Sequence, residues 1–283
     1  MKTYSTPVRA GKSGLIPCVC GCNDFKPALE CEGFGYVRCV SCGLVQMNPQ
    51  PEKTEVIERY SGVSGKDYLS YELENEESFL ALQKLALKDA GFYKLEKKIY
   101  NSAGRRILDA GCATGSLLAH LRSRGWNVTG VEISPCAEYA KSERNLDVRS
   151  LSLEEADFEE GSFDMVLASH LIEHLNNPLS FLMEVKRILK KNGRVFITTP
   201  NISGFQARLY GGGWRSAIFD HLYLFSAETL TRLLKSAGFK IEKIHTWGGL
   251  ALGLSPEWIK KPADFLAKRF GFGDVMIVRA VSN

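Results

Sequence analysis

The pattern of hydrophobic and polar positions changes near residue 100. Beyond that point, short runs of aliphatic and β-branched residues alternate with segments whose apolar residues recur at helical spacing. The runs predict strands at Arg106–Ala110, Asn127–Ile133, Val148–Leu151, Phe163–Ser169, Arg194–Thr199, Phe239–Thr246 and Asp274–Ala280. The segments between them predict helices at Ser116–Ser123, Pro135–Arg144, Pro178–Lys190 and Ala227–Ala237. This regular alternation predicts an α/β fold with a mainly parallel sheet covered on both faces.

The first hundred residues follow a different pattern. Residues 15–50 carry six of the eight cysteines, and the Asn-Pro-Gln-Pro run at 48–51 indicates a boundary. The pattern from residue 52 to 100 is mostly helical, with a break at 61–65. We therefore predict a cysteine-rich module over residues 1–51, a helical connector over 52–103 and the α/β domain over 104–283.

Composition narrows the class of protein. The 283 residues are 45% hydrophobic and 24% charged with a net charge of +4, which is typical of a globular protein and only mildly basic. No run of ~18 apolar residues predicts a membrane span, and the first residues lack the apolar segment of a signal peptide. We therefore expect a cytoplasmic protein without a membrane partner, and nucleic acid is a disfavoured partner. The sequence leaves the oligomeric state open.

A glycine-rich turn follows the first strand predicted in the α/β domain. The run Ile-Leu-Asp-Ala-Gly-Cys-Ala-Thr-Gly places Asp109 at the strand end and Gly111 and Gly115 in the turn. Glycines let the backbone approach a ligand closely, and open parallel sheets bind ligands at the carboxyl ends of their strands. The next strand leads to Glu132, about 20 residues further on, where a carboxylate can accept hydrogen bonds from both hydroxyls of a ribose.

Two further segments extend this pattern. A polar loop, Leu-Ser-Leu-Glu-Glu-Ala, occupies residues 151–156, and the strand at 163–169 is followed by His-Leu-Ile-Glu-His. In this order and spacing, the segments resemble the class I S-adenosylmethionine-dependent methyltransferases, most closely the branch that includes the ubiquinone-type O-methyltransferases. The resemblance runs from about residue 104 to 283. It implies a doubly wound, seven-stranded, Rossmann-like sheet with the last strand antiparallel, and S-adenosylmethionine as cofactor.

The resemblance also implies which residues contact the cofactor. The glycine turn would lie beside its methionine part, the acid after the second strand would hold the ribose, and the residues after strands two and three would contact the adenine. The implied residues are Asp109, Gly111 and Gly115 at the turn, Glu132 and Ile133 after the second strand, Ser152 and Leu153 in the polar loop, and Ser169 at the end of the fourth strand.

The segment after the fourth strand supplies candidates for proton transfer. A sulfonium methyl is already electrophilic, so the protein mainly aligns the nucleophile, and an oxygen nucleophile gains from a general base. His170, Glu173 and His174 lie where the acceptor is expected, and the two histidines share a face if the segment is helical. Two interpretations stay open. The residues form a base or a divalent-metal pair that lowers the pKa of the acceptor, or they order the loop and the cofactor.

Residues 205–225 predict a lid over the acceptor. The segment is rich in glycine and aromatic residues and contains His221 as a further catalytic candidate. It also resembles the same branch of methyltransferases, including Trp214, His221 and Phe225. Its aromatic residues suit ordinary packing equally well.

The cysteine-rich module predicts a structural zinc site. Cys39 and Cys42 are separated by two residues and followed by a glycine, a spacing that lets two thiolates share one tetrahedral ion. The first half of the predicted site has no such pair with two residues between the cysteines, because Cys18, Cys20 and Cys22 alternate with single residues. We assign Cys18, Cys20, Cys39 and Cys42 as the ligands, with Cys22 as an alternative. A ribbon without metal, its cysteines reduced, is the other interpretation.

Three functions stay open, of which the first is favoured. It is transfer of a methyl group from S-adenosylmethionine to a small-molecule acceptor, at oxygen. The second is a zinc-ribbon methyltransferase for a guanine of ribosomal RNA, which the interleaving of Lys26 and Arg38 with Glu30 and Glu32 disfavours. The third is a non-catalytic S-adenosylmethionine-binding protein, which the intact glycine turn disfavours. The lack of an Asn/Asp-Pro-Pro-Tyr run after the fourth strand argues against methylation of the exocyclic amines of adenine or cytosine.

Overall fold

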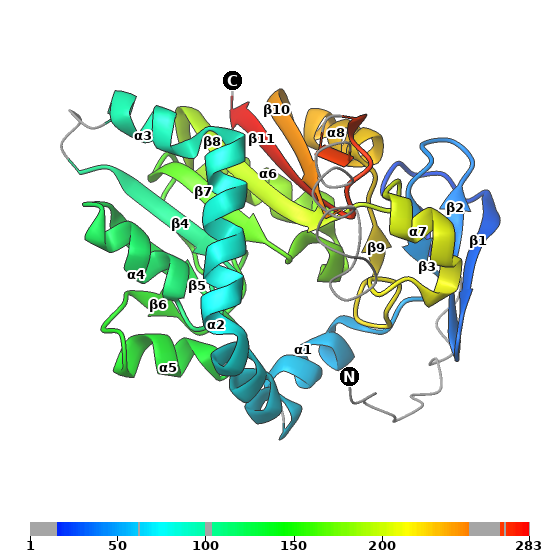
Figure 1. The fold of residues 1–283 in the computed structure, drawn as a ribbon, viewed down its shortest axis with the longest axis horizontal. Helices are drawn as coiled ribbons and strands as arrows, with labels where there is room; N and C mark the ends of the chain where they lie inside the picture. Colours follow the sequence, from blue (N-terminus) through cyan, green and yellow to red (C-terminus); the bar gives the residue numbers. More distant parts are fainter. Residues whose placement is uncertain (1–15, 62, 100–103, 249–266, 269, 283) are drawn as a thin grey trace, which may run out of the picture.

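A seven-stranded sheet forms the centre of the molecule (Figure 1). The computed structural model describes residues 16–61, 63–99, 104–248, 267–268 and 270–282. The strands are β4 (Arg106–Ala110), β5 (Asn127–Val131), β6 (Val148–Arg149), β7 (Phe163–Ser169), β8 (Leu189–Pro200), β10 (Phe239–Trp247) and β11 (Val275–Ser282). Their order is β10-β11-β8-β7-β4-β5-β6. Strands β4 to β8 pair in parallel, and β11 runs antiparallel to β8 and β10. The predicted Rossmann-like fold class is confirmed.

The helices of this domain lie where the apolar periodicity predicted them. They are α4 (Ser116–Ser123), α5 (Cys136–Ser142), α6 (Pro178–Ile188) and α8 (Ala227–Ser236). The largest difference lies after α6, where the chain enters β8 at once and not at the predicted Arg194. Leu189 already pairs with Phe163 of β7, so strand pairing ends the helix two residues before its predicted end.

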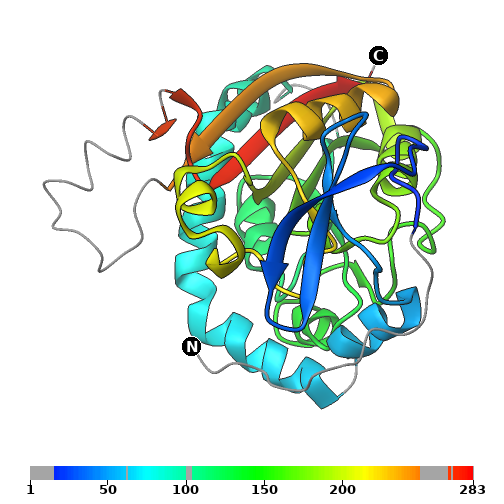
Figure 2. The same ribbon diagram turned by 90° about the vertical axis from the view of Figure 1, so that its right-hand side faces the viewer.

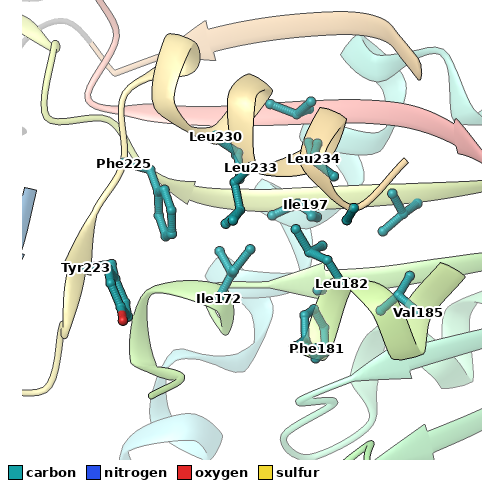
Figure 3. Packing of buried hydrophobic residues seen from close by; sticks show 14 of the residues in the cluster. Ile172, Phe181, Leu182, Val185, Ile197, Tyr223, Phe225, Leu230, Leu233 and Leu234 are labelled. Atoms are coloured by element: carbon teal, nitrogen blue, oxygen red, sulfur yellow. The ribbon is translucent and has the colours of Figure 1, made fainter. Parts of the chain in front are cut away.

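The two faces of the sheet bury alternate residues of the same strands. Met165 and Leu167 of β7 pack with α4 residues on one face, whereas Val166 and Ala168 belong to the core on the other face. This alternation follows from the two-residue period of a strand. Figure 3 shows the second face, where Leu182 of α6 and the leucines of α8 meet Ile197 of β8.

The predicted helical connector forms three helices, α1 (Lys53–Ser61), α2 (Val63–Ala90) and α3 (Phe92–Ile99). Helix α2 begins at Val63, inside the break that the sequence predicted at 61–65, and runs on to Ala90. Its C-terminal part, with Ala86 and Leu87, packs with α4 and β7 residues in one cluster (Figure 1).

The cysteine-rich module folds as an antiparallel sheet that borrows a strand from the α/β domain. Strands β1 (Phe25–Cys31), β2 (Phe34–Cys39) and β3 (Val45–Met47) are joined by β9 (Tyr223–Leu224), in the order β1-β2-β3-β9. Figure 2 views the molecule from the side on which these strands lie. The domain limits therefore stay a prediction, because hydrogen bonds cross from the module into the predicted lid.

The lid segment itself begins after β8. It forms α7 (Phe205–Tyr210) and a short 3-10 turn, η2 (Gly211–Gly213), before it reaches β9. Within the part of the chain that the structure describes, no helix has the length and apolar character to cross a bilayer.

Candidate functional site

The turn after β4 has the tight geometry that its glycines predicted. Gly111 and Gly115 take φ angles of 70° and 76°, in the left-handed region that favours glycine. A Cβ at Gly115 would lie 2.5 Å from Leu146 Cδ1, so this glycine also allows close packing. Gly115 is the N-cap of α4, directly before its first residue, and no side chain caps this helix end.

Two carboxylates flank this turn. Glu132 accepts hydrogen bonds from the backbone N–H groups of Ala113 (3.0 Å) and Ser134 (2.9 Å), one on each oxygen. Asp109 is buried, and its Oδ1 has no hydrogen-bond partner among the described residues. Burial and the nearby charge of Glu132 raise the pKa of Asp109 well above its usual range.

This acidic pair fits a cationic, ribose-containing cofactor. A carboxylate oxygen has more than one acceptor position, so each Glu132 oxygen can accept a ribose hydroxyl beside its backbone donor. The orphaned oxygen of Asp109 can accept a bond from a ligand, and a positive ligand charge would offset the repulsion between the two carboxylates. S-adenosylmethionine, with its sulfonium and ammonium groups, has this chemistry.

The remaining cofactor candidates lie along the same edge, with different side-chain roles. Ser152 bonds to Glu155 through its hydroxyl (2.6 Å), and the side chain of Leu153 is buried in the core. Ile133, two residues beyond β5, and Ser169, the last residue of β7, are half-buried. Any contact of Leu153 with an adenine would therefore come from its backbone.

Helix α2 covers the glycine turn, which the sequence reasoning did not foresee. Glu76 accepts a hydrogen bond from the Thr114 hydroxyl (2.6 Å) and forms an ion pair with Arg144. One turn earlier, Glu72 lies within electrostatic range of Glu132, and burial followed by that neighbouring charge raises the pKa of Glu72. The four-residue spacing of Tyr68, Glu72 and Glu76 puts them on one helix face, a signal that could have identified them.

A second cluster forms beyond the end of β7. Glu173, His174 and His221 place one ligand atom each within 4.8 Å of the others. Glu173 and His174 belong to a 3-10 turn, η1 (Ile172–His174), and His221 lies two residues before β9. The imidazole centroids of His174 and His221 are 4.7 Å apart, edge to face.

Backbone carbonyls select the tautomers of both imidazoles. His174 Nδ1 is 2.8 Å from the carbonyl oxygen of Asp220, and His221 Nδ1 is 2.8 Å from that of Ser216. A carbonyl only accepts, so each Nδ1 carries the hydrogen and each neutral ring keeps its lone pair on Nε2. The Tyr60 hydroxyl lies 3.0 Å from His174 Nδ1 and completes this contact from α1.

The charges of the cluster are set by burial and by the neighbouring groups. Burial, aided by the neighbouring His174, lowers the pKa of His221 to about 4, so this ring is neutral near pH 7. Burial alone would raise the pKa of Glu173, but interactions with His170 and the other histidines outweigh it and hold that pKa at about 2. Glu173 also accepts a hydrogen bond from the Thr199 hydroxyl (2.9 Å).

His170 lies at the rim of this cluster. Its backbone φ is 52° and its side chain is half exposed, with Nδ1 3.3 Å from Glu173 Oε1, an ion-pair distance without hydrogen-bond alignment. Because His170 precedes the 3-10 turn, the condition for a shared helical face with His174 is not met. The structure instead brings His174 together with His221, which lies 47 positions further along the chain.

The cysteine cluster contains the four residues assigned from the sequence. The Sγ atoms of Cys18, Cys20, Cys39 and Cys42 lie within 4.8 Å of one another. Two of the separations are 3.4 Å (Cys18–Cys42) and 3.6 Å (Cys20–Cys39). Tetrahedral zinc with bonds of about 2.3 Å needs sulfurs about 3.8 Å apart, so the four thiols fit the ion. Cys22 instead contacts the backbone of Asp24.

Comparisons with known proteins agree with this geometry. The sequence profile of the family described as "Methyltransferase domain" matches residues 81–244. A ubiquinone biosynthesis O-methyltransferase of Dechloromonas aromatica is 37% identical over 106 residues, 35% of this chain and 46% of that protein. The corresponding enzyme of Idiomarina loihiensis is 27% identical over 163 residues, 55% of this chain and 63% of that protein. The chain thus spans about half the length of the curated relatives it matches.

Solved structures share the fold. An S-adenosylmethionine-dependent methyltransferase of Thermotoga maritima aligns with a TM-score of 0.55 at 23% identity, covering 81% of this chain and 99% of that one. Another from Archaeoglobus fulgidus gives 0.54 at 22% identity, covering 75% and 99%.

Proposed function

Because this chain belongs to the class I S-adenosylmethionine-dependent methyltransferases, we propose that it transfers a methyl group to an oxygen atom of a small-molecule acceptor. One observation carries this proposal. Asp109 lies near the carboxyl end of β4, Glu132 follows β5, and Glu173 and His174 follow β7, all at the same edge of the sheet. His221 joins Glu173 and His174 from the segment before β9. A donor site and a proton acceptor therefore lie side by side.

The first site binds the methyl donor. Bound S-adenosylmethionine supplies a methyl group on a positively charged sulfur. Asp109 offers an unpaired oxygen to this cation, and Glu132 accepts the hydrogen bonds of the ribose hydroxyls. Helix α2 covers the turn through Glu76 and limits the access of water.

In the second site, His174 acts as the general base. Its Nδ1–H is held by the Asp220 carbonyl, so Nε2 is free to accept the proton of an acceptor hydroxyl. Glu173 stabilises the imidazolium that forms, because it is charged and lies within 4.8 Å. His221, neutral and buried, orients the acceptor, and His170 lies at the entrance.

A divalent ion is the second candidate for the same cluster. Two imidazole nitrogens and a carboxylate oxygen within 4.8 Å are a ligand set that suits such an ion. The ion would lower the pKa of the acceptor hydroxyl and replace the base. A chelator-sensitive rate that magnesium or zinc restores would favour the ion, and an insensitive rate would favour His174 as base.

We also propose that Cys18, Cys20, Cys39 and Cys42 hold one structural zinc ion. Its four thiolates leave no open position, so the ion would stabilise the module and take no part in methyl transfer.

An extract labelling experiment tests the function. The protein is incubated with cell extract and S-adenosylmethionine that carries an isotopically labelled methyl group, and the products are analysed by mass spectrometry. We expect label in a small molecule, on oxygen. Label in ribosomal RNA would instead support the guanine methyltransferase, and cofactor binding without any labelled product would support a binding protein.

A further inference from the structure

Strand pairing joins the cysteine-rich module to the segment that carries His221. Strand β3 pairs with β9 at Val45–Leu224 and Gln46–Tyr223, and Met47 N–H donates to the carbonyl of Leu222 (2.9 Å). Leu222 directly follows His221. The sheet of the module is therefore continuous with the chain that carries one of the two imidazoles (Figure 2).

Tyr36 of β2 fixes the turn before β9. Its hydroxyl lies 2.7 Å from the carbonyl oxygen of Ile218 and 2.9 Å from that of His221. The ring is 2% exposed, so water does not replace these contacts. A phenol has one hydrogen, which the two carbonyls share. The turn is further closed by the bond from His221 N–H to Ile218 O (3.0 Å).

The same turn supplies the acceptors that orient both imidazoles. The Ser216 carbonyl holds His221 Nδ1, and the Asp220 carbonyl holds His174 Nδ1. Arg59 pairs with the Asp220 side chain at 2.6 Å and lies over the ring of Phe219. A shift of residues 216–221 would therefore turn both rings away from Glu173.

We propose that Tyr36 is a positioning residue, through which the cysteine-rich module holds residues 216–221 so that His174 and His221 face Glu173. This role rests on the proposed function for its catalytic meaning, but the geometry can be tested without any turnover. The module then stabilises the chain around His174 and His221 and does not contact the substrate.

Imidazole nitrogen NMR on the full chain tests this directly. In the unmodified protein we expect both rings as the tautomer with hydrogen on Nδ1. Tyr36→Phe removes only the hydroxyl and should move the tautomer signals of both rings. Tyr71→Phe, at an exposed tyrosine, is the control.

A second variant reaches the same contact from the other side. A Cβ at Gly212 would lie 1.9 Å from the Glu30 carbonyl oxygen of β1, whereas a Cβ at Gly213 would meet nothing described within 4 Å. Gly212→Ala should therefore push the module off the turn and reproduce the shifts of Tyr36→Phe. Gly213→Ala should leave them unchanged.

Two outcomes decide the matter. Unchanged His174 and His221 signals in Tyr36→Phe and Gly212→Ala, with both variants folded by circular dichroism, would overturn the positioning role. Calorimetry with S-adenosylhomocysteine should give the same affinity within about twofold in all variants, since a hydroxyl outside the cofactor site contributes no binding contact. Failure of the unmodified protein to bind this compound would count against the proposed function, while the imidazole shifts would still decide the role of Tyr36.

Discussion

The two halves of the candidate site are built in different ways. The cofactor half consists of a strand end, the turn that follows it and the end of the next strand, all within residues 109–134. The acceptor half joins Tyr60 of α1, the turn after β7 and the segment before β9. The first is fixed mainly by local backbone geometry, and the second exists only when segments far apart in sequence pack together.

This difference makes selective disruption possible. A change in the cysteine-rich module or the lid should damage the acceptor half and spare cofactor binding. A change at the turn after β4 should do the reverse. The following predictions test that separation.

The largest effect is expected for loss of the proposed zinc ion. Structural zinc sites bind with about 10–16 kcal/mol, so removing one ligand should release the ion. Cys39→Ser should reduce the metal content from about one zinc per chain to near zero, by the four-thiolate stoichiometry. Turnover should fall while cofactor affinity is retained. Elemental analysis and calorimetry measure both.

Cys22→Ser is the matched control for the zinc ligand, because its thiol contacts the backbone of Asp24 and not the cluster. It should keep the metal. Metal-free unmodified protein from zinc-replete cells, with the module still folded, would exclude the zinc site.

Replacement of the proposed general base should give the next largest effect. His174→Ala should lower turnover by about 10²–10⁴-fold, the usual contribution of a positioned base. Cofactor affinity should barely change, because a base acts mainly in the transition state. Steady-state kinetics and calorimetry test this, with His245→Ala on β10 as the control. If the single replacements of His170, His174 and His221 all leave turnover within a fewfold, the oxygen-plus-base mechanism is wrong, although the family assignment stands.

A smaller effect is expected at the ribose contact. Glu132→Ala should weaken the binding of S-adenosylmethionine and of its demethylated product by about 1–3 kcal/mol, the scale of hydrogen bonds to a charged group. Isothermal titration measures both affinities. Glu138→Ala, at an exposed carboxylate on α5, should leave them unchanged. Equal affinities in Glu132→Ala and the unmodified protein would remove Glu132 from this role.

The smallest effect is a pH dependence of cofactor binding. Burial and Glu132 raise the pKa of Asp109 in the free protein, and a bound cation would lower it again. Binding should therefore release protons, and the affinity should rise with pH through the range where free Asp109 ionises. Calorimetry in buffers of different ionisation enthalpy detects the released protons. Asp109→Asn should abolish this pH dependence, and a flat profile in the unmodified protein would contradict it.

The backbone geometry of the glycine turn could be predicted from the sequence, whereas the cofactor roles of its residues stay predictions. The sequence indicates Gly111 and Gly115 because glycines allow a tight turn and a close approach to a ligand. It indicates Glu132 because an acid ends the second predicted strand, where it can accept hydrogen bonds from a ribose. The sequence did not predict that helix α2 covers the glycine turn. Glu76 is one of several polar residues of this helix, and only the packing of α2 brings it to Thr114.

The acceptor half was only partly predictable. The place of the segment after a strand indicates His170, Glu173 and His174 as candidates. The two histidines would share a face only in an α-helix, and the structure has a short 3-10 turn there. His221 was a candidate without a partner. The Ser216 and Asp220 carbonyls that select the tautomers are backbone groups, which no residue pattern reveals.

The sequence by itself determined the α/β class, the glycine turn, the acid after the second strand and the clustering of six cysteines in the first 42 residues. Each of these follows from rules that act over a few residues, such as strand periodicity, glycine conformations and ligand spacing. Only the tertiary structure decided that the thiols of Cys18 and Cys20, and not that of Cys22, face Cys39 and Cys42. It also decided that β9 completes the sheet of the module and that Tyr36 reaches the His221 turn. The physical reason is that these contacts join segments up to 185 positions apart, so the packing of the whole chain sets their geometry.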